Sequence, residues 1–407
     1  MDTTPWKTDK WFTSPWNFAD EVKSTYHFNK NIKLHDISLR DGEQQAGLIF
    51  SKDEKVRLAE KMAEIGIHRI EAGMPAVSPD DKAAITQIVK MNLGPEIFAF
   101  CRCVKADVEK AADIGVSGIV IEIPSSDHMI EKAYKWDLEK TIDLSIEATS
   151  YAKEKGLYTV FFPIDMSRAD MHWAMTLIKR VADEGHMDAL AIVDTFGGLN
   201  PSAIPYLIKT VKSYIDKPIE VHFHDDFGLG SANTILGLAA GADVAHTTIS
   251  AIGERAGNAS YEEVALSLLT MYGVDLGLKY DKIYELSKMM CEMTGMQVRP
   301  NQGIIGDKIA EIESGIITGW YNNVKEHDPL ELTPYLPELT GHPDNVIVLG
   351  KGSGLPSIEY YLKKTGFEIP PAEKCMDILN AVKATAIQKH GLVSEKKFVE
   401  ITKKFLN

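Results

Sequence analysis

The hexapeptide "VHFHDD" carries two histidines two residues apart in a strand-like run. Side chains of a strand alternate between its two faces, so His222 and His224 point the same way and Phe223 points the other way. Two imidazoles among carboxylates are typical of a divalent metal site. The alternative is a pair of histidines that only hydrogen-bond their polar neighbours. A metal ion would need a third ligand, and Asp41 is the candidate.

The stretch "HDISLRDGEQQAG" places Arg40 directly before Asp41. A metal ion and an arginine on one side of a pocket both stabilise negative oxygen. This suits a 2-oxo acid that binds through its keto and carboxylate oxygens. Arg40 would stabilise the alkoxide or enolate that develops, and Glu43 would orient Arg40. The alternative is that Arg40 only forms a salt bridge with Glu43 or Glu71.

These residues belong to a chain that alternates short apolar strands with amphipathic helices from residue 31 onward. Eight strands are expected, at residues 32–38, 69–73, 97–103, 118–124, 158–164, 189–195, 219–224 and 244–252. Several helices end at a glycine just before the next strand, as in "AEIGIHRI" and "ADIGVSGI". This pattern predicts an α/β fold, a (β/α)₈ TIM barrel. A doubly wound open sheet is the alternative, but no G-x-G-x-x-G motif follows the first strand.

Catalytic residues of such a barrel lie at the carboxyl ends of its strands. Polar residues gather at the predicted strand ends: Arg40, Asp41, Glu43, Glu71, Glu122, Ser125, Ser126, Asp127, His128, Asp165, Arg168, Asp194, Thr195, His222, His224, Asp225, Asp226, Glu254, Arg255 and Asn258. Only the eighth strand separates the first from the seventh in a closed barrel. Asp41 would therefore lie near His222 and His224.

The other residues of this rim receive roles from their chemistry. Thr195 is placed to hydrogen-bond a substrate carboxylate, or alternatively caps a turn or a helix. Asn258 could add an oxygen ligand or a contact behind the ligands. The remaining rim residues would complete the active site, with Glu71 and Asp165 as catalytic residues and His128 and Arg168 as substrate-binding residues. A Schiff-base aldolase would need a lysine at a strand end, and no predicted strand end carries one.

The composition narrows the classes of partner. The chain has 44 Lys and Arg against 58 Asp and Glu, a net charge of −14. This argues against a nucleic acid or an anionic membrane as the partner, because binding phosphates requires clustered positive charge. No apolar run has the length of a membrane span, and the N-terminal residues lack an apolar signal core. We therefore expect a cytoplasmic protein.

Three regions differ in composition. Residues 1–30 are rich in Trp and Phe and predict an arm that docks on the body or on a partner subunit. Residues 31–277 form the predicted barrel. Residues 278–407 lose the alternation and predict a mainly helical subdomain.

Several motifs resemble those of the DRE-TIM metallolyase family. "HDISLRDGEQ" resembles the family's "DTTLRDGEQ" opening, and "IEAGMPAVSPDD", "DTFGGLNP", "VHFHDDFGLGSANTILGLAAGA", "GERAGN" and "GKGSG" match later motifs in the same order. The resemblance covers roughly residues 31–360 and is closest to the branch of 2-isopropylmalate and homocitrate synthases. It implies an acyltransferase that joins acetyl-CoA to a 2-oxo acid by a Claisen condensation and then hydrolyses the thioester.

The resemblance also assigns site residues and partners. It implies a divalent metal held by Asp41, His222 and His224, with Asn258 beside the metal. Nitrogen and oxygen ligands of this kind accept Mg²⁺, Mn²⁺, Co²⁺ or Zn²⁺. It makes Arg40 the catalytic arginine and places Thr195 near the substrate carboxylate. It further implies a homodimer in which the helical region covers the partner's active site.

The chain departs from the family pattern at four places. The usual Glu-Asp pair after the fifth strand is Ile164-Asp165, the histidine of "SGIH" is Ile317, the asparagine of "HxHND" is Asp225, and the histidine of "GKHSG" is Gly352. Tyr321, His327 and His128 are the candidates for the missing base.

Two other functions stay open. One is a metal-dependent C–C lyase, aldolase or decarboxylase that acts on a 2-oxo or 2-hydroxy acid without CoA. The other is a catalytically silent protein that senses a 2-oxo acid.

Overall fold

A computed structural model describes residues 4–406 and separates two compact units. Pro15–Val298 form the barrel unit, and the described residues before Pro15 and from Arg299 onward form the C-terminal unit. The barrel unit is larger than the predicted barrel of residues 31–277. The rings of Tyr26 and Phe28 pack on Tyr272, which ties the segment before the first strand to the barrel. Residues 278–298 also join the barrel unit by their contacts.

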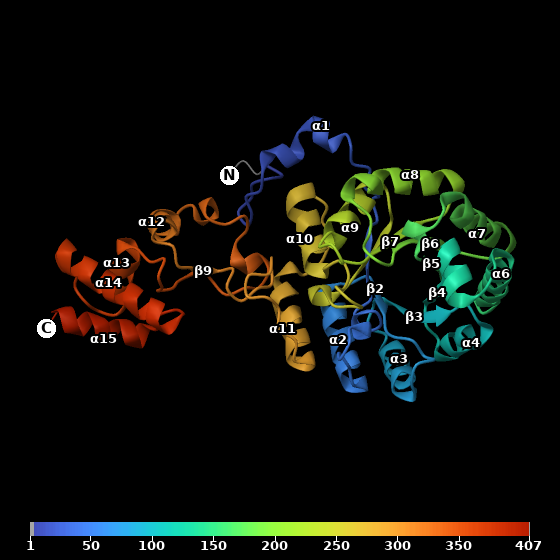
Figure 1. The fold of residues 1–407 in the computed structure, drawn as a ribbon, viewed down its shortest axis with the longest axis horizontal. Coiled ribbons are helices and arrows are strands. Elements are labelled where there is room, and N and C mark those ends of the chain that lie inside the picture. The colour runs from blue at the N-terminus through green and yellow to red at the C-terminus, as the bar shows by residue number, and fades with distance from the viewer. Residues whose placement is uncertain (1–3, 407) are drawn as a thin grey trace. The chain divides into compact units, whose positions relative to one another are not determined.

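The barrel unit is built around eight parallel strands that close into a ring, with each strand paired to its sequence neighbours and β1 paired to β8. This confirms the predicted fold, and Figure 1 shows the helices around the strands. The strands are β1 (Lys33–Asp36), β2 (Arg69–Glu71), β3 (Glu96–Arg102), β4 (Gly118–Pro124), β5 (Tyr158–Ile164), β6 (Ala189–Asp194), β7 (Ile219–Phe223) and β8 (Val244–Thr247).

Helices connect each strand to the next. The barrel unit contains α1 (Asp20–Lys23), α2 (Lys52–Ile65), α3 (Pro79–Met91), α4 (Lys105–Ile114), α5 (Asp127–Met129), α6 (Leu138–Glu154), α7 (Met171–Glu184), α8 (Ile204–Tyr214), α9 (Gly230–Ala239), α10 (Tyr261–Tyr272) and α11 (Ile283–Thr294). Local sequence sets their ends. Ser51 and Glu54 form a capping box at the start of α2, and Gly66 ends that helix in the left-handed conformation at φ 100°.

The lumen of the barrel has two chemically different halves. Its apolar half comes mainly from β3 to β6, through Phe98, Phe100, Val120, Val160, Phe162, Ala189, Ala191 and Val193. Its polar half comes from β7, β8, β1 and β2, where Glu220, His246, His35 and Arg69 are buried. The polar half therefore includes β1 and β7, the strands whose carboxyl ends carry the predicted metal ligands.

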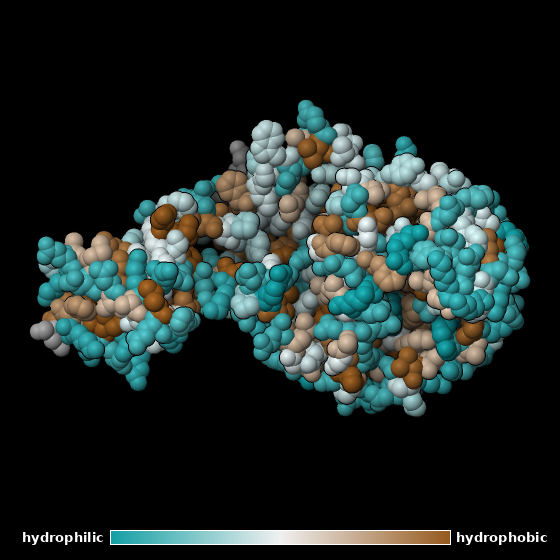
Figure 2. Space-filling view, viewed as in Figure 1, coloured by the Kyte–Doolittle hydropathy of each residue, from teal (hydrophilic) through white to brown (hydrophobic). Residues whose placement is uncertain are grey.

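The C-terminal unit is mainly helical, as predicted. It contains β9 (Glu311–Ile312), α12 (Gly315–Val324), β10 (Val346–Ile347), α13 (Leu355–Lys364), α14 (Ala372–Lys389) and α15 (Glu395–Leu406). Its own core includes Ile358, Leu362, Ile378 and Phe398, all fully buried. Across residues 4–406, no helix combines the length and the apolarity that crossing a membrane requires. The face of the barrel unit seen in Figure 2 is mostly hydrophilic, with smaller apolar areas between.

A buried carboxyl group in β1 predicts a measurable pH dependence of stability. Asp36 is fully buried, and burial raises its pKa from 3.8 to about 7, with Glu262 and Glu71 adding to the increase and hydrogen bonds from Ser38 opposing it. A carboxyl whose pKa is raised on folding is protonated in the folded state at pH 5. Its stabilising contribution is lost as the pH rises through about 7.

Asp36→Asn should therefore gain stability relative to the parent protein as the pH rises from 5 to 8, by up to about 3 kcal/mol. Urea unfolding at both pH values measures the difference. The exposed Asp53→Asn serves as control and should give the same difference from the parent at both pH values. If the difference in stability between Asp36→Asn and the parent were the same at pH 5 and pH 8, Asp36 would not be the buried, protonated carboxyl described here.

Candidate active site

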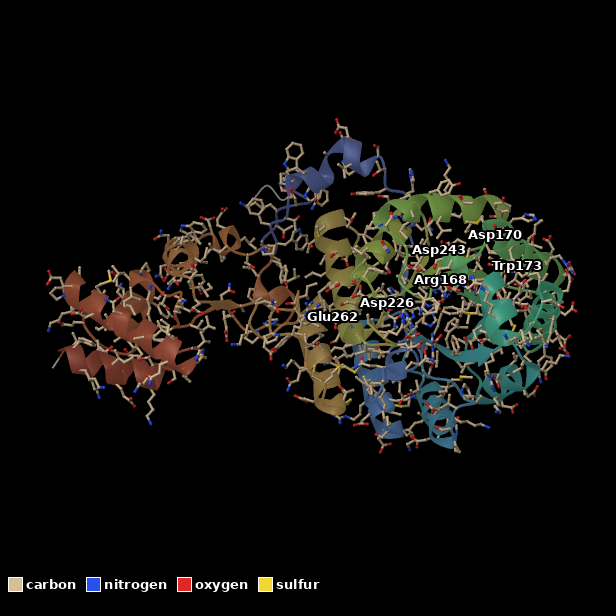
Figure 3. The ribbon with its side chains drawn as sticks, in the orientation of Figure 1. Arg168, Asp170, Trp173, Asp226, Asp243 and Glu262 are labelled. Carbon is tan, nitrogen blue, oxygen red and sulfur yellow. The ribbon has the colours of Figure 1, made fainter. Side chains whose placement is uncertain are left out.

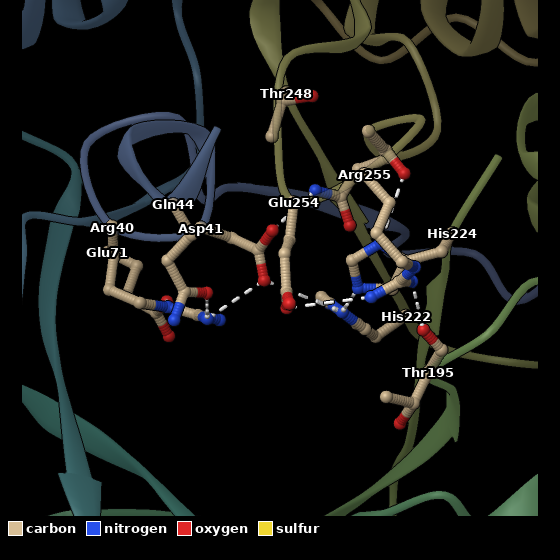
Figure 4. Close-up of polar contacts among 12 residues, drawn as sticks. Arg40, Asp41, Gln44, Glu71, Thr195, His222, His224, Thr248, Glu254 and Arg255 are labelled. Atoms are coloured by element: carbon tan, nitrogen blue, oxygen red, sulfur yellow. Dashed lines mark hydrogen bonds and ion pairs between the residues drawn. The ribbon is translucent and has the colours of Figure 1, made fainter. Parts of the chain in front are cut away.

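Three side chains converge at the carboxyl end of the barrel. The ligand atoms of Asp41, His222 and His224 all lie within 4.8 Å of one another, and all three residues are buried (Figure 4). The two Nε2 atoms are 3.3 Å apart, and His222 Nε2 lies 3.8 Å from Asp41 Oδ2. Two imidazole nitrogens that face each other and a carboxylate form a donor set for a divalent cation.

The loop after β8 holds these donors in place. Asn258 Nδ2 donates to Asp41 Oδ1 at 2.7 Å, and His224 Nδ1 lies 3.1 Å from the carbonyl oxygen of Gly257. This carbonyl fixes the proton of His224 on Nδ1 and leaves the Nε2 lone pair for a metal. Gly253 and Gly257 have φ of +146° and +86°. A Cβ at Gly253 would overlap Asn258 Nδ2, so the "GERAGN" motif needs both glycines.

The electrostatics of these donors favour the forms that bind metal. Burial lowers the pKa of His222 well below its ordinary value, with His224, His246 and Arg40 adding to the decrease. Burial acts to raise the pKa of Asp41, but the charge of Arg40, the neighbouring His224 and the hydrogen bond from Asn258 outweigh it, so the pKa falls below its ordinary value. The imidazole of His222 is therefore neutral, and the carboxylate of Asp41 is ionised. Among the described residues, His222 Nδ1 and Asn258 Oδ1 have no hydrogen-bond partner. These residues fit a divalent ion.

Arg40 lies beside this cluster and is held on three sides. Its Nε donates to Glu71, and its Nη1 donates to Asp41 Oδ2 at 2.8 Å and to Gln44 Oε1 at 3.0 Å. Its guanidinium carbon lies 3.9 Å from the centre of the Phe100 ring. Buried Nη2 has no hydrogen-bond partner among the described residues. Arg40 is thus fixed in place with one N–H group available for an anionic ligand.

Glu43 does not take the predicted place beside Arg40. Its Oε2 is 2.6 Å from Lys55 Nζ, and its Oε1 accepts from the backbone N–H of Phe50 at 2.8 Å. Glu71 and Gln44 orient Arg40 instead. The reason is that buried Lys55, on α2, lies close enough to neutralise Glu43.

A second group of predicted residues meets between β4 and β5. Asp165 is fully buried with φ of 63°, and its carboxylate binds Arg168 Nε at 2.6 Å, Ser126 Oγ at 2.6 Å and His128 Nε2 at 3.0 Å. Its backbone N–H donates to Thr195 Oγ1 at 2.8 Å. Arg168, labelled in Figure 3, also lies 3.8 Å from the centre of the Phe196 ring. Within residues 4–406, no hydrogen bond or ion pair joins His128 or Arg168 to Asp41, His222 or His224; His128 and Arg168 form a separate ionic group on the same rim.

A cluster deeper in the lumen was not anticipated from the sequence. His35, Glu220 and His246 also place possible ligand atoms within 4.8 Å of one another. However, Arg69 Nη1 lies 2.7 Å from Glu220 Oε1 and already neutralises that carboxylate. A cation at this lower cluster would add an unbalanced buried charge. At Asp41, His222 and His224, by contrast, Arg40 is shared between Asp41 and Glu71, so that donor set is better suited to a cation. The alternation rule puts Glu220 on the same face as His222, which was the available signal.

Comparison with known proteins finds relatives that are similar to this chain in sequence and solved structures that are similar in fold. A family model described as HMGL-like matches residues 31–290. Homocitrate synthase AksA of Methanothermobacter thermautotrophicus is 34% identical over 97% of this chain and 98% of its own. 2-Isopropylmalate synthase 2 of Caldanaerobacter subterraneus is 34% identical over 88% of this chain and 92% of its own. The crystal structure of an HMG-CoA lyase from Bacillus subtilis has a TM-score of 0.60 at 19% identity, over 67% of this chain and 96% of that chain, which supports the fold.

Proposed function

The chain belongs to the HMGL-like family, and we propose that it joins the acyl group of acetyl-CoA or a related acyl-CoA to the carbonyl carbon of a 2-oxo acid. Its relatives are named as homocitrate and 2-isopropylmalate synthases. The observation that carries the proposal is the position of Arg40 beside Asp41, His222 and His224, with Nη2 available for a substrate oxygen.

A divalent ion, Mg²⁺, Mn²⁺, Co²⁺ or Zn²⁺, would be held by Asp41, His222 and His224, with Asn258 beside them. When bound it supplies a Lewis acid that polarises the carbonyl group of the 2-oxo acid. The two imidazoles and the carboxylate suit all four ions, so the donor set alone does not select among them.

The protein's own groups bind and orient the substrate. Arg40 donates to the oxygen that becomes negative as the new C–C bond forms, and its contacts with Glu71 and Gln44 keep it in place. Thr195 Oγ1 accepts from the N–H of Asp165, so its own hydroxyl proton remains to be donated to the substrate carboxylate. Arg168 and His128, fixed by Asp165, add positive charge and a hydrogen bond on the opposite side of the rim.

A screen of 2-oxo acids tests this proposal. The protein is incubated with acetyl-CoA, Mn²⁺ or Mg²⁺ and one 2-oxo acid at a time, and released CoA thiol is measured. At least one acid is expected to give thiol release that depends on both the acid and the metal. Absence of thiol release with every acid would refute the proposal. The homodimer and the cytoplasmic location predicted from the sequence are parts of the same proposal.

Ile164 favours a second candidate, a lyase or decarboxylase that uses no CoA. Its side chain packs against the apolar cluster of the lumen, where a carboxylate would otherwise face the substrate. The test is incubation of 2-oxo and 2-hydroxy diacids with the protein and Mn²⁺ but without CoA. Cleavage products would support the lyase, and unchanged diacids would count against it.

A further inference from the structure

One carboxyl group at the mouth of the barrel has no role in the site described so far. Glu122 lies on β4, two residues after Val120, whose side chain belongs to the apolar cluster of the lumen. Side chains two apart in a strand share a face, so Glu122 also points into the lumen. Its Cα is paired with Arg102 on β3 and with Phe162 on β5. The side chain is partly exposed, unlike most lumen residues.

Glu122 differs from its acidic neighbours in having no partner. Within residues 4–406, its carboxylate makes no hydrogen bond and no ion pair. Arg40 and Arg102 are the two arginines whose charges act on Glu122, and both are paired with other carboxylates. Arg102 binds both oxygens of Asp107, and Arg40 binds Glu71 and Asp41. Burial raises the pKa of Glu122, and the charges of Arg40 and Arg102 oppose the increase.

The other carboxylates at the mouth are poorly suited to accept a proton. Glu71 is bound by Arg40, Glu43 is bound by Lys55, and Asp165 is bound by Arg168, Ser126 and His128. These ion pairs and hydrogen bonds occupy the carboxylate oxygens that would have to face the substrate. A carboxylate in a partly apolar site is a stronger base. Among Glu43, Glu71, Asp165 and Glu122, only the carboxylate of Glu122 is not occupied by another side chain of residues 4–406.

Carbon–carbon bond formation from a thioester requires such a base, because the proton next to the thioester carbonyl is only weakly acidic. Arg40 and Glu122 lie close enough for their charges to interact, and Arg40 stacks on Phe100, another lumen residue. A proton acceptor and a group that stabilises negative oxygen therefore face the same space.

We propose that Glu122 is the general base of the condensation, an inference that rests on the proposed function. Its carboxylate takes a proton from the carbon next to the thioester carbonyl, and the C–H electron pair passes into the enolate. The enolate carbon then bonds to the carbonyl carbon of the 2-oxo acid, whose oxygen receives the electron pair and then a proton. Water finally cleaves the thioester, its hydroxyl going to the acyl carbon and its proton to the leaving thiolate.

The test compares Glu122→Gln, Glu122→Asp and Glu96→Gln with the parent protein. Glu96→Gln is the matched control, because it makes the same change at the opposite end of the neighbouring strand β3. Each protein receives acetyl-CoA and the 2-oxo acid identified in the screen. Thiol release, binding of the 2-oxo acid by calorimetry, and deuterium incorporation from D₂O into the acetyl methyl group are measured.

Glu122→Gln should lose thiol release and any deuterium incorporation seen in the parent by about 10²-fold or more, while its affinity for the 2-oxo acid stays within about threefold. Glu122→Asp should recover part of the rate, and Glu96→Gln should behave like the parent. Glu122→Gln retaining more than about a tenth of the parental rate, or losing acid binding together with turnover, overturns the inference. A parent protein that releases no thiol with any acid overturns the proposed function itself.

Discussion

Replacing His222 by alanine should lower metal-dependent thiol release by about 10³-fold or more, which corresponds to the several kcal/mol that a Lewis acid contributes to a transition state. The same change should weaken Mn²⁺ binding, because His222 Nε2 is one of three converging donors. A cavity or fold defect would not remove metal binding selectively. Calorimetric titration of the metal-free protein with Mn²⁺ therefore provides a readout independent of turnover.

His186→Ala is the matched control. His186 pairs with Asp188 in the connection before β6, at the opposite end of the strands from the site. This variant should bind Mn²⁺ and release thiol like the parent protein. The parent should bind one Mn²⁺ per chain, because Arg69 already neutralises Glu220 in the second cluster, formed by His35, Glu220 and His246. Wild-type affinity for Mn²⁺ in His222→Ala would show that the metal lies elsewhere.

The barrel could be predicted from the sequence because its signals are local. Apolar runs, amphipathic helices and the glycines that end them repeat along the chain, and Gly66 and Gly115 adopt the left-handed conformation expected of them. Eight successive strand–helix units favour a closed barrel, and the pairing of β1 with β8 confirms it. The extent of the barrel unit was harder to predict, because α11 resembles the helices of the C-terminal unit in composition but contacts α2.

The cluster of Asp41, His222 and His224 was predictable for a similar reason. Alternation along β7 puts His222 and His224 on one face, and the barrel order brings Asp41 close to them. The partner of Arg40 was not predictable in this way. Glu43 is three residues away in sequence and Glu71 is 31 away, yet a buried lysine draws Glu43 toward α2. Competition between two carboxylates for two cations depends on side-chain positions that no local pattern encodes.

The contacts within the polar half of the lumen depend on the register in which neighbouring strands pair. His35 and His246 are Cα partners across β1 and β8, and Arg69 on β2 reaches Glu220 on β7 across the lumen. Nothing in a single strand indicates these contacts. Burial acts to raise the pKa of Glu220, but the hydrogen bond with His246, the neighbouring His35 and the charge of Arg69 bring it below its ordinary value. Glu220 is therefore a fully buried carboxylate whose charge depends on Arg69.

Arg69 and Glu220 differ in the ion pairs that each retains when the other residue is replaced. Arg69 also binds Glu96 at 2.7 Å, and Glu96 is partly exposed to solvent. Within residues 4–406, Glu220 is paired with no second arginine or lysine, and its remaining hydrogen bond is with His246. Loss of Arg69 would leave a buried charge uncompensated, whereas glutamine at 220 could still accept from Arg69 and His246. The two single substitutions should therefore have unequal costs.

Arg69→Met should lower the free energy of unfolding by about 3–5 kcal/mol, the cost of leaving one member of a buried pair charged. Glu220→Gln should cost clearly less, and adding Glu220→Gln to Arg69→Met should restore part of the lost stability because it removes the stranded charge. Urea unfolding at pH 7.5 measures all three variants. Arg180→Met, which removes an exposed ion pair with Glu184, is the control and should leave the midpoint unchanged. Equal losses for Arg69→Met and Glu220→Gln, without recovery in the double variant, would contradict the buried-charge explanation, because simple loss of packing predicts additive costs.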